Sequence, residues 1–428
     1  MVSRPGGDRR ASGEQHSLLI LSTVAPRTRQ PRPEGAVGAV HGSSPRPRYV
    51  PAPLASRPFA SAIGEWAHVL ETTPLLELGA RADQARRQKH PGNVVSYIVD
   101  RNINYTNLCV TDCRFCAFYR RPKDEEAYVL EYEEIGRKID EARAVGAVQI
   151  LMQGGHNPYL PLDWYLGLLR HIKEHHPIHV HGLSASEIEL IVKVSRLPLD
   201  EVLRQLHEAG LDSIPGAGAE VLVDGVRDVI APKKIAANRW LEIHEAAHEA
   251  GLLTTATLMY GVGETWEDRL EHMLKLRASQ QRSLQRGRGR YTAFIAWSFQ
   301  PLHTEMQDWD LPLGTGMDYL LVTALGRLVL DNIENLQVSY VTQGPKMAQI
   351  ALRFGANDFG SLMIEENVVS AAGTDFIMPE AEIRRLISDA GFTPQRRAQD
   401  YSLIGDDDGC PCCTWRNGVT TSAGAREA

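Results

Sequence analysis

The sequence predicts an α/β protein with a (β/α)8 barrel of the TIM type, a short helical cap before the barrel and disordered tails. Short runs rich in β-branched residues alternate with longer amphipathic runs, and the connections between them are a few residues long. This alternation indicates parallel βαβ units. Seven or eight such units without an internal nucleotide-binding fingerprint favour a closed barrel over an open sheet.

The composition is that of a large globular chain. The 428 residues are 43% hydrophobic and 23% charged, and the formal net charge is −7. This negative balance gives no reason to expect nucleic-acid binding, and no apolar run approaches the roughly 20 residues of a membrane helix. We therefore expect a cytoplasmic protein with reduced thiols, in which clustered cysteines bind metal or do chemistry.

The hydrophobic pattern predicts the elements in order. A helical cap is expected at 62–90. Strands are expected at 93–99, 147–155, 178–186, 210–218, 252–263, 291–301 and 336–344. Helices are expected at 132–147, 162–176, 186–209, 235–251, 265–280, 318–334, 345–354 and 380–390. The helix at 265–280 opens with a capping box from Thr265 to Asp268.

Both ends of the chain lie outside this pattern. Residues 1–58 are rich in Arg, Pro and Gly and are expected to be disordered, because they cannot bury enough apolar surface to offset their ordering entropy. Residues 59–395 are expected to form the barrel with its flanking helices, and 396–428 a loose tail. The tail contains three cysteines that are expected to be flexible thiols, namely Cys410, Cys412 and Cys413.

Three further cysteines stand in the stretch YTNLCVTDCRFCAFYR, directly after the first strand. Loops at that end of barrel strands build active sites. Cys109, Cys113 and Cys116 have the spacing C-x3-C-x2-C, and the loop offers no fourth ligand for a closed zinc site. Three thiolates on a cubane iron–sulfur cluster leave one iron open for a small molecule. A zinc site with a distant fourth ligand and inert buried thiols are the alternatives.

This motif, with Phe115 before its last cysteine, resembles that of the radical S-adenosylmethionine (SAM) superfamily. The resemblance implies that the three cysteines hold a [4Fe–4S] cluster whose open iron binds SAM, with Phe115 among the cofactor-binding residues. It also implies that an electron cleaves SAM and releases a 5′-deoxyadenosyl radical, which takes hydrogen from a substrate. A reducing donor such as flavodoxin or ferredoxin is the implied partner.

Longer stretches resemble one family of this superfamily. HGLSASEIE, FIAWSFQP and GPKMAQIALRFGANDFGSLMIEENVVSAAG are similar to cyclic dehypoxanthinylfutalosine synthases of menaquinone biosynthesis, and the similarity spans about 62–395. The implied reaction removes hydrogen from ribose C4′ of dehypoxanthine futalosine and closes the ring by radical addition to its benzoate. The alternatives are aminofutalosine synthase, a deazaflavin (F0) synthase subunit and, from a different class, a cluster-bearing electron carrier or a zinc-stabilised binding module.

Four other residues are expected to bind SAM. Gly154 and Gly155 begin the stretch GGHNP, where glycine lets the backbone approach the cofactor closely. His156 follows where the superfamily usually has an acidic residue. Ser186 and Glu220 are the other two. Ser184 and Glu187, like Ser186, are candidates to bind the ribose of the cofactor. The alternatives are an ordinary turn at the glycines, a first-turn glutamate at the start of a helix, and helix capping by Ser184, Ser186 and Glu187.

His179 and His181 are the candidate catalytic residues. They are two positions apart, so both imidazoles lie on one face of the predicted strand. A position at the barrel mouth would make them polar contacts or proton acceptors for the substrate, whereas a satisfied interior histidine is the alternative. Gln149 and Gln153 show the same alternation on the preceding strand.

The implied substrate contains a benzoate, which requires a cation. The candidates are Arg227, Lys233, Lys234 and Lys346. A dense polar stretch near the end of the similar region is also expected to contribute to the site, although the sequence leaves open which residue contacts the ribose. It consists of Asn357, Asp358, Glu365, Glu366 and Asn367.

Overall fold

The computed structural model describes residues 46–374 and 378–405. Every described helix and strand lies between Leu54 and Ile404. The expectations for 1–45 and for the three cysteines after residue 405 lie outside the described residues. No described helix is long and apolar enough to cross a membrane.

The described strands form one sheet of 11 strands in the order β11-β10-β1-β9-β8-β7-β6-β5-β4-β3-β2. Every pair is parallel except β10 with β11. The bounds are β1 Val94–Ile98, β2 Asp100–Ile103, β3 Gln149–Met152, β4 His179–Gly182, β5 Ser213–Ile214, β6 Leu253–Tyr260, β7 Tyr291–Ser298, β8 Asn335–Gln337, β9 Asp358–Ser361, β10 Thr393–Arg397 and β11 Leu403–Ile404.

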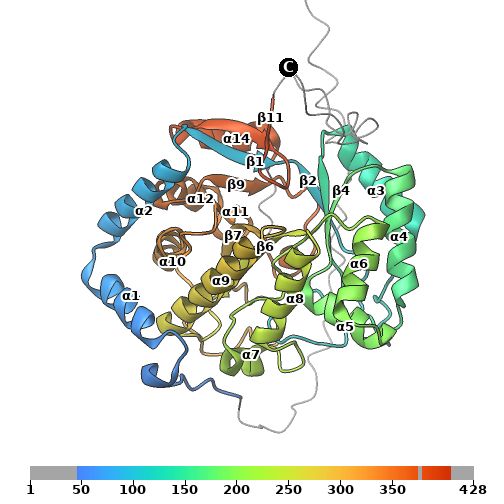
Figure 1. Ribbon diagram of the computed structural model, residues 1–428, viewed down its shortest axis with the longest axis horizontal. Coiled ribbons are helices and arrows are strands. Elements are labelled where there is room, and N and C mark those ends of the chain that lie inside the picture. The colour runs from blue at the N-terminus through green and yellow to red at the C-terminus, as the bar shows by residue number, and fades with distance from the viewer. Residues whose placement is uncertain (1–45, 375–377, 406–428) are drawn as a thin grey trace, which may run out of the picture. The chain divides into compact units, whose positions relative to one another are not determined.

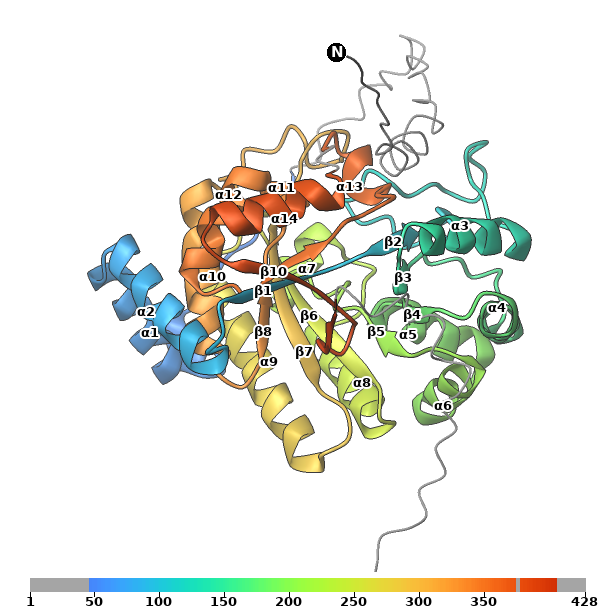
Figure 2. The same cartoon turned by 90° about the horizontal axis from the view of Figure 1, so that it is seen from above.

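A single stretch of chain closes the sheet into a barrel. Only Val99 separates β1 from β2, and the two run on almost in line (Figure 2). β1 pairs with β9, whereas β2 pairs with β3 at the other end of the strand order. With β1 and β2 taken as one strand, the described residues contain an eight-stranded parallel barrel, which confirms the predicted fold class. We call the junction of β9, β1–β2 and β3 the barrel seam.

Helices connect the strands and cover the outside of the barrel, with α3 to α6 on the right of Figure 1 and α1, α2 and α10 on the left. Their bounds are α1 Ala60–Thr72, α2 Leu75–Lys89, α3 Tyr132–Ala144, α4 Leu162–His175, α5 Ala185–Ser195, α6 Leu199–Ala209, α7 Asp224–Ile230, α8 Ala237–Glu249, α9 Trp266–Arg286, α10 Gly316–Val329, α11 Tyr340–Gln343, α12 Pro345–Ala351, α13 Val368–Ala371 and α14 Glu380–Asp389.

The predicted helical cap is confirmed as α1 and α2, and the capping box of α9 is present between Thr265 and Asp268. The helical stretches expected at 186–209 are confirmed as α5 and α6. They are separate helices because proline lacks the N–H that a continuing helix needs, and Pro198 caps α6. The strand expected at 336–344 is wrong beyond Gln337, where the chain turns into α11. A short apolar run does not reveal by its period whether it forms a strand or a helix.

The ordered part extends past both boundaries drawn from the sequence. Tyr49 donates its hydroxyl to Asp268 of α9 at 2.7 Å, and Arg57 pairs with the same carboxylate at 2.6 Å. At the other end, β10 runs to Arg397 and β11 follows it. Residues 48–58 and 396–405 therefore belong to the folded unit.

Candidate active site

A cavity of about 380 Å³ lies inside the barrel, on the side of the loops that follow the strands. This volume is in the range of small-molecule sites. Residues from the cysteine loop, the GGH stretch, the segment 215–218 that follows β5 and the other strands of the barrel line it. Its wall includes most of the candidates from the sequence, namely Cys109, Cys113, Phe115, Cys116, Gly154, Gly155, His181, Glu220 and Lys234.

The cysteine loop folds back on itself and is tied to the GGH stretch. The amide of Cys109 donates to the carbonyl of Arg120 at 2.9 Å, and the amide of Arg120 donates to the carbonyl of Asn107 at 2.8 Å. The amide of Val110 donates to the carbonyl of His156 at 3.1 Å. The loop thus holds its thiols toward the cavity through backbone bonds.

The three thiols fit a cubane cluster better than a single ion. Burial raises the pKa of Cys113 to about 12 and also raises that of Cys116, so thiolates there need a metal to stabilise them. Among the described residues, no three His, Cys, Asp or Glu side chains converge on one ion. A zinc ion requires such convergence, whereas a cubane bonds each thiolate to a different iron.

The two glycines of GGH are required by the packing of the loops. A Cβ atom at Gly154 would lie 2.5 Å from the ring of Tyr105, and one at Gly155 would lie 2.2 Å from the carbonyl oxygen of Leu108. The amide of Gly155 donates to the carbonyl of Thr106 at 2.9 Å. The glycines therefore do more than form an ordinary turn, because they let the second loop press against the cysteine loop.

Glu187 connects the start of α5 with the loops that follow β2 and β3. It forms a capping box with Ser184 at the start of α5, so the capping interpretation of these two residues is confirmed. It also accepts bonds from the hydroxyl of Tyr105 at 2.6 Å and from the amide of Gly154 at 2.9 Å. Ser186 is buried behind Gly218, and its hydroxyl has no hydrogen-bond partner in the described part of the chain.

Glu220 and Lys234 form an ion pair beside the cysteine loop. Nζ of Lys234 lies 2.6 Å from Oε1 of Glu220 and 5.3 Å from the centroid of the Phe115 ring. Burial opposes the ammonium charge, but Glu220 and the thiol of Cys113 outweigh it and raise the pKa of Lys234. Glu220 lies four residues before α7, so its interpretation as a first-turn residue is wrong.

His179 and His181 point to the same side of β4 and share one hydroxyl. Nδ1 of His181 and Nε2 of His179 each lie 2.7 Å from Oγ of Ser213 on β5. Burial lowers the pKa of both imidazoles. His181 lines the cavity, as do Gln149 and Gln153.

The four candidate cations for the benzoate differ in whether they reach the cavity. Arg227 donates to backbone carbonyls, Lys346 is exposed, and Lys233 is paired with Asp112 at 2.6 Å on the surface. In the described residues, the lysine and the arginine that line the cavity are Lys234 and Arg397.

Arg397 on β10 is a residue that the sequence did not reveal. It is 2% exposed, its Nε lies 2.6 Å from Oδ2 of Asp358, and its guanidinium lies 3.9 Å from the centroid of the Tyr401 ring. No alternating pattern marks the segment TPQRR as a strand that enters the barrel.

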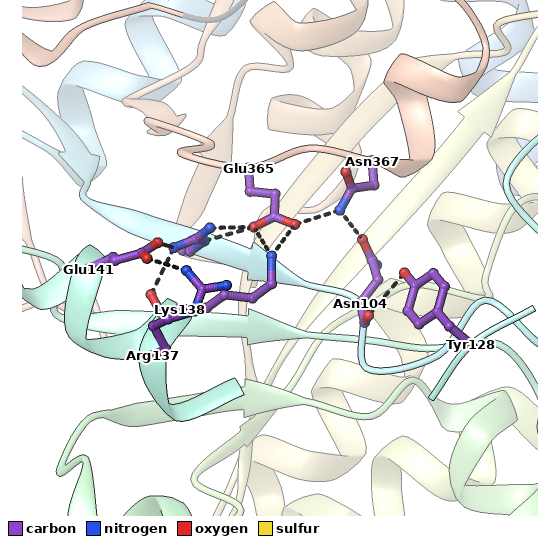
Figure 3. Close-up of polar contacts among 8 residues, drawn as sticks. Asn104, Tyr128, Arg137, Lys138, Glu141, Glu365 and Asn367 are labelled. Atoms are coloured by element: carbon purple, nitrogen blue, oxygen red, sulfur yellow. Dashed lines mark hydrogen bonds and ion pairs between the residues drawn. The ribbon is translucent and has the colours of Figure 1, made fainter. Parts of the chain in front are cut away.

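The part of the polar stretch that follows β9 is divided between the cavity and the outside of the barrel. Glu366 lines the cavity. Glu365 points to the outer side of β2, where it accepts from Arg101 at 2.8 Å and Lys138 at 2.9 Å (Figure 3). The side-chain nitrogen Nδ2 of Asn367 donates to Oε1 of Glu365 at 2.9 Å and to Oδ1 of Asn104 at 3.2 Å. These outer bonds hold the backbone that presents Glu366.

The chain matches two family models. One, described as the radical SAM superfamily, matches residues 103–276, and the other, described as the CofH/MqnC C-terminal region, matches residues 288–407. Among solved structures, methylornithine synthase (PylB) has a TM-score of 0.60 at 16% identity, covering 79% of this chain and 94% of that one. The maturase HydG has a TM-score of 0.59 at 16% identity, covering 76% of this chain and 70% of that one. These two likenesses concern the fold.

Curated relatives are much closer in sequence. Cyclic dehypoxanthine futalosine synthase of Halalkalibacterium halodurans is 45% identical over 78% of this chain and 89% of the relative. The protein of the same name from Streptomyces coelicolor is 41% identical over 78% and 84%. The 5-amino-6-(D-ribitylamino)uracil–L-tyrosine 4-hydroxyphenyl transferase of Archaeoglobus fulgidus is 38% identical over 76% and 92%.

Together with the barrel and its three-cysteine loop, these matches define the class: the chain is a radical SAM enzyme. Membership of this class implies a [4Fe–4S] cluster and SAM. Within the class, the chain belongs to the cyclic dehypoxanthine futalosine synthase family.

Proposed function

We propose that this enzyme cyclises dehypoxanthine futalosine to cyclic dehypoxanthinylfutalosine in menaquinone biosynthesis. The observation that carries the proposal is the 45% identity to the Halalkalibacterium halodurans synthase over 89% of that protein. The cavity with three cysteines in its wall supports it, because its volume is in the range of small-molecule sites.

The proposed reaction is a ring closure. A [4Fe–4S] cluster on Cys109, Cys113 and Cys116 and SAM supply, when bound, the 5′-deoxyadenosyl radical that removes a hydrogen atom. Ribose C4′ loses that atom and bonds to a carbon of the benzoate ring. One proton then goes to a base and one electron to an oxidised one-electron carrier such as flavodoxin or ferredoxin, which restores aromaticity. The product has two hydrogen atoms fewer than the substrate.

The chain's own groups position SAM in this proposal. Gly154 and Gly155 offer backbone atoms at a close distance, and Phe115 packs beside the cofactor. Oε2 of Glu220 is buried without a partner in the described residues, so it suits an ammonium group. The hydroxyl of Ser186 is unpartnered in the same way. A flavodoxin or ferredoxin is the proposed source of the reducing electron.

We assign to His181 the role of the base that accepts the proton released when the ring becomes aromatic again. Its burial favours the neutral imidazole, which accepts protons, and it lines the cavity. Ser213 connects it to His179 through two contacts of 2.7 Å. This arrangement supports a path in which His179 takes the proton onward from the cavity.

The Archaeoglobus fulgidus relative favours a second candidate function. The Archaeoglobus fulgidus protein is 38% identical over 92% of its length and is named as a 4-hydroxyphenyl transferase acting on 5-amino-6-(D-ribitylamino)uracil and L-tyrosine. That reaction transfers a group between two substrates, whereas the proposed cyclisation needs one.

An anaerobic assay separates the candidates. Reconstituted protein is incubated with SAM, dithionite and either dehypoxanthine futalosine or the two transferase substrates. The proposal predicts 5′-deoxyadenosine together with a product two hydrogen atoms lighter than dehypoxanthine futalosine. Product from the transferase substrates alone, or deoxyadenosine without any change in dehypoxanthine futalosine, would contradict it.

A further inference from the structure

Several buried polar atoms of cavity-lining residues have no hydrogen-bond partner in the described part of the chain. They belong to Asn102, Gln149, Glu220, Tyr340 and Tyr401. Buried polar groups in folded proteins are nearly always paired, so such atoms mark places where a ligand or a water molecule completes the bonding. Asn102 and Gln149 lie on adjacent strands of the barrel seam.

The two amides at the seam have a fixed orientation. Nδ2 of Asn102 donates to Oε2 of Glu366 at 2.9 Å, and Nε2 of Gln149 donates to Oδ2 of Asp100 at 2.7 Å. Turning either amide over would place its carbonyl oxygen against a carboxylate oxygen. The unpartnered atoms are therefore acceptors, Oδ1 of Asn102 and Oε1 of Gln149.

Both carboxylates are held by other groups as well. Glu366 accepts from the amides of Val368 at 2.7 Å and Val369 at 2.9 Å at the start of α13. Asp100 accepts from the hydroxyl of Ser361 on β9. The carboxylates are thus fixed by the protein, and they fix the amides in turn.

Tyr340 adds a third unpartnered group near the seam. Its ring stacks on Phe359 with centroids 5.7 Å apart, and it is 1% exposed. Burial, and to a smaller extent the charges of Asp100 and Glu366, raise the pKa of its hydroxyl. That hydroxyl has no hydrogen-bond partner in the described residues.

We propose that Asn102, Gln149 and Tyr340 bind the sugar hydroxyl groups of the substrate. Carbonyl acceptors match neutral O–H donors and offer no hydrogen to a carboxylate, so the benzoate end lies away from these two amides. The inference rests on the proposed function for the identity of the sugar. It also fits the relative whose named substrate has a D-ribityl chain, because that chain presents hydroxyl groups too.

Tyr340→Phe is the sharpest variant, because it removes only an oxygen that makes no bond to the described protein. Tyr260→Phe is the matched control: its hydroxyl is equally buried and unpartnered, but Tyr260 is not among the described residues that line the cavity. Gln149→Met is a second test that removes the carbonyl acceptor. Both tyrosine variants are expected to keep the wild-type melting temperature.

Ligand binding is measured by calorimetry on cluster-loaded protein with SAM and without reductant, so that no turnover occurs. The probes are dehypoxanthine futalosine and 5-amino-6-(D-ribitylamino)uracil. The inference predicts that the ligand which binds the wild type loses about three- to tenfold affinity in Tyr340→Phe, from one hydrogen bond, and also loses affinity in Gln149→Met. Tyr260→Phe should bind like the wild type.

The two ligands separate failure of the subsite from failure of the proposed function. Binding of the ribityl compound alone, weakened by Tyr340→Phe, would support the subsite and contradict the proposed substrate. Unchanged affinity in Tyr340→Phe, or no binding of either compound to the wild type, would overturn the subsite.

Discussion

Nζ of Lys234 lies 2.6 Å from Oε1 of Glu220, in a buried position beside the loop of Cys113. The ammonium compensates a carboxylate that would otherwise be buried alone. A pair of this kind is costly to break from one side, because the remaining charge keeps its desolvation cost. Removing Lys234 should therefore cost more stability than removing a lysine that forms an ion pair on the nearby surface.

Lys234→Met is expected to lower the free energy of unfolding by about 3–5 kcal/mol, since it leaves Glu220 unpaired. Urea unfolding of the anaerobic protein measures the change. The matched control is Lys233→Met, which removes an exposed lysine paired with Asp112 and should cost less than about 1 kcal/mol. Equal costs in the two variants would show that the buried pair has no special role.

Gly155→Ala is expected to reduce the iron content of the purified protein. Its Cβ atom would lie 2.2 Å from the carbonyl oxygen of Leu108, so the cysteine loop must shift, at a cost of about 1–3 kcal/mol. Iron analysis and thermal unfolding measure both effects. Gly92→Ala serves as the control, because a Cβ atom there meets nothing within 4 Å. Full iron loading in Gly155→Ala would argue against the tight contact between the two loops.

His181→Gln is expected to uncouple the reaction. Deoxyadenosine should still form, but cyclised product should fall about 10²- to 10⁴-fold, the usual contribution of an acid–base group. His179→Gln should show a smaller loss, because His179 reaches the cavity through Ser213. Mass spectrometry of both products measures the ratio, and a parallel fall of both would assign His181 a role before proton transfer.

Acid should destabilise the protein through its buried histidines. Burial lowers the pKa of His272 and of His248 from 6.5 to about 3, and the amide of Leu222 donates to Nδ1 of His272 at 2.9 Å. The unfolded chain therefore binds more protons than the folded one between these pH values, so stability falls as pH drops below about 6.5.

His272→Gln tests this account through the slope of stability against pH. Urea unfolding between about pH 7 and pH 5 should show a slope smaller than that of the wild type by up to about 1.4 kcal/mol per pH unit, the effect of one proton. An unchanged slope would mean that His272 does not stay neutral in the folded state.

The barrel and its cysteine loop could be predicted because their signals are local. Period-two and helical patterns follow from burial of one face, and Cys109, Cys113 and Cys116 stand within eight residues. Glu187 was open to two interpretations, and its bonds to Tyr105 and Gly154 depend on folding that brings three loops together. Arg397 gave no signal, because β10 is a polar segment held by backbone pairing with β1.

The division of the polar stretch after β9 was also beyond the sequence. Glu365 and Glu366 are adjacent, yet the first pairs with Arg101 outside the barrel and the second lines the cavity. Which of two neighbouring carboxylates faces inward is set by the strand and helix that each one meets. That choice depends on the barrel seam, which forms from segments about 260 residues apart.

The most direct test of the central claim is electron paramagnetic resonance of the anaerobically reduced protein before and after SAM is added. Three cysteine ligands leave one iron of a cubane open, so the account predicts a [4Fe–4S]⁺ signal whose g values shift when SAM binds. A signal that SAM leaves unchanged, or protein that takes up no iron under reconstitution, would contradict it.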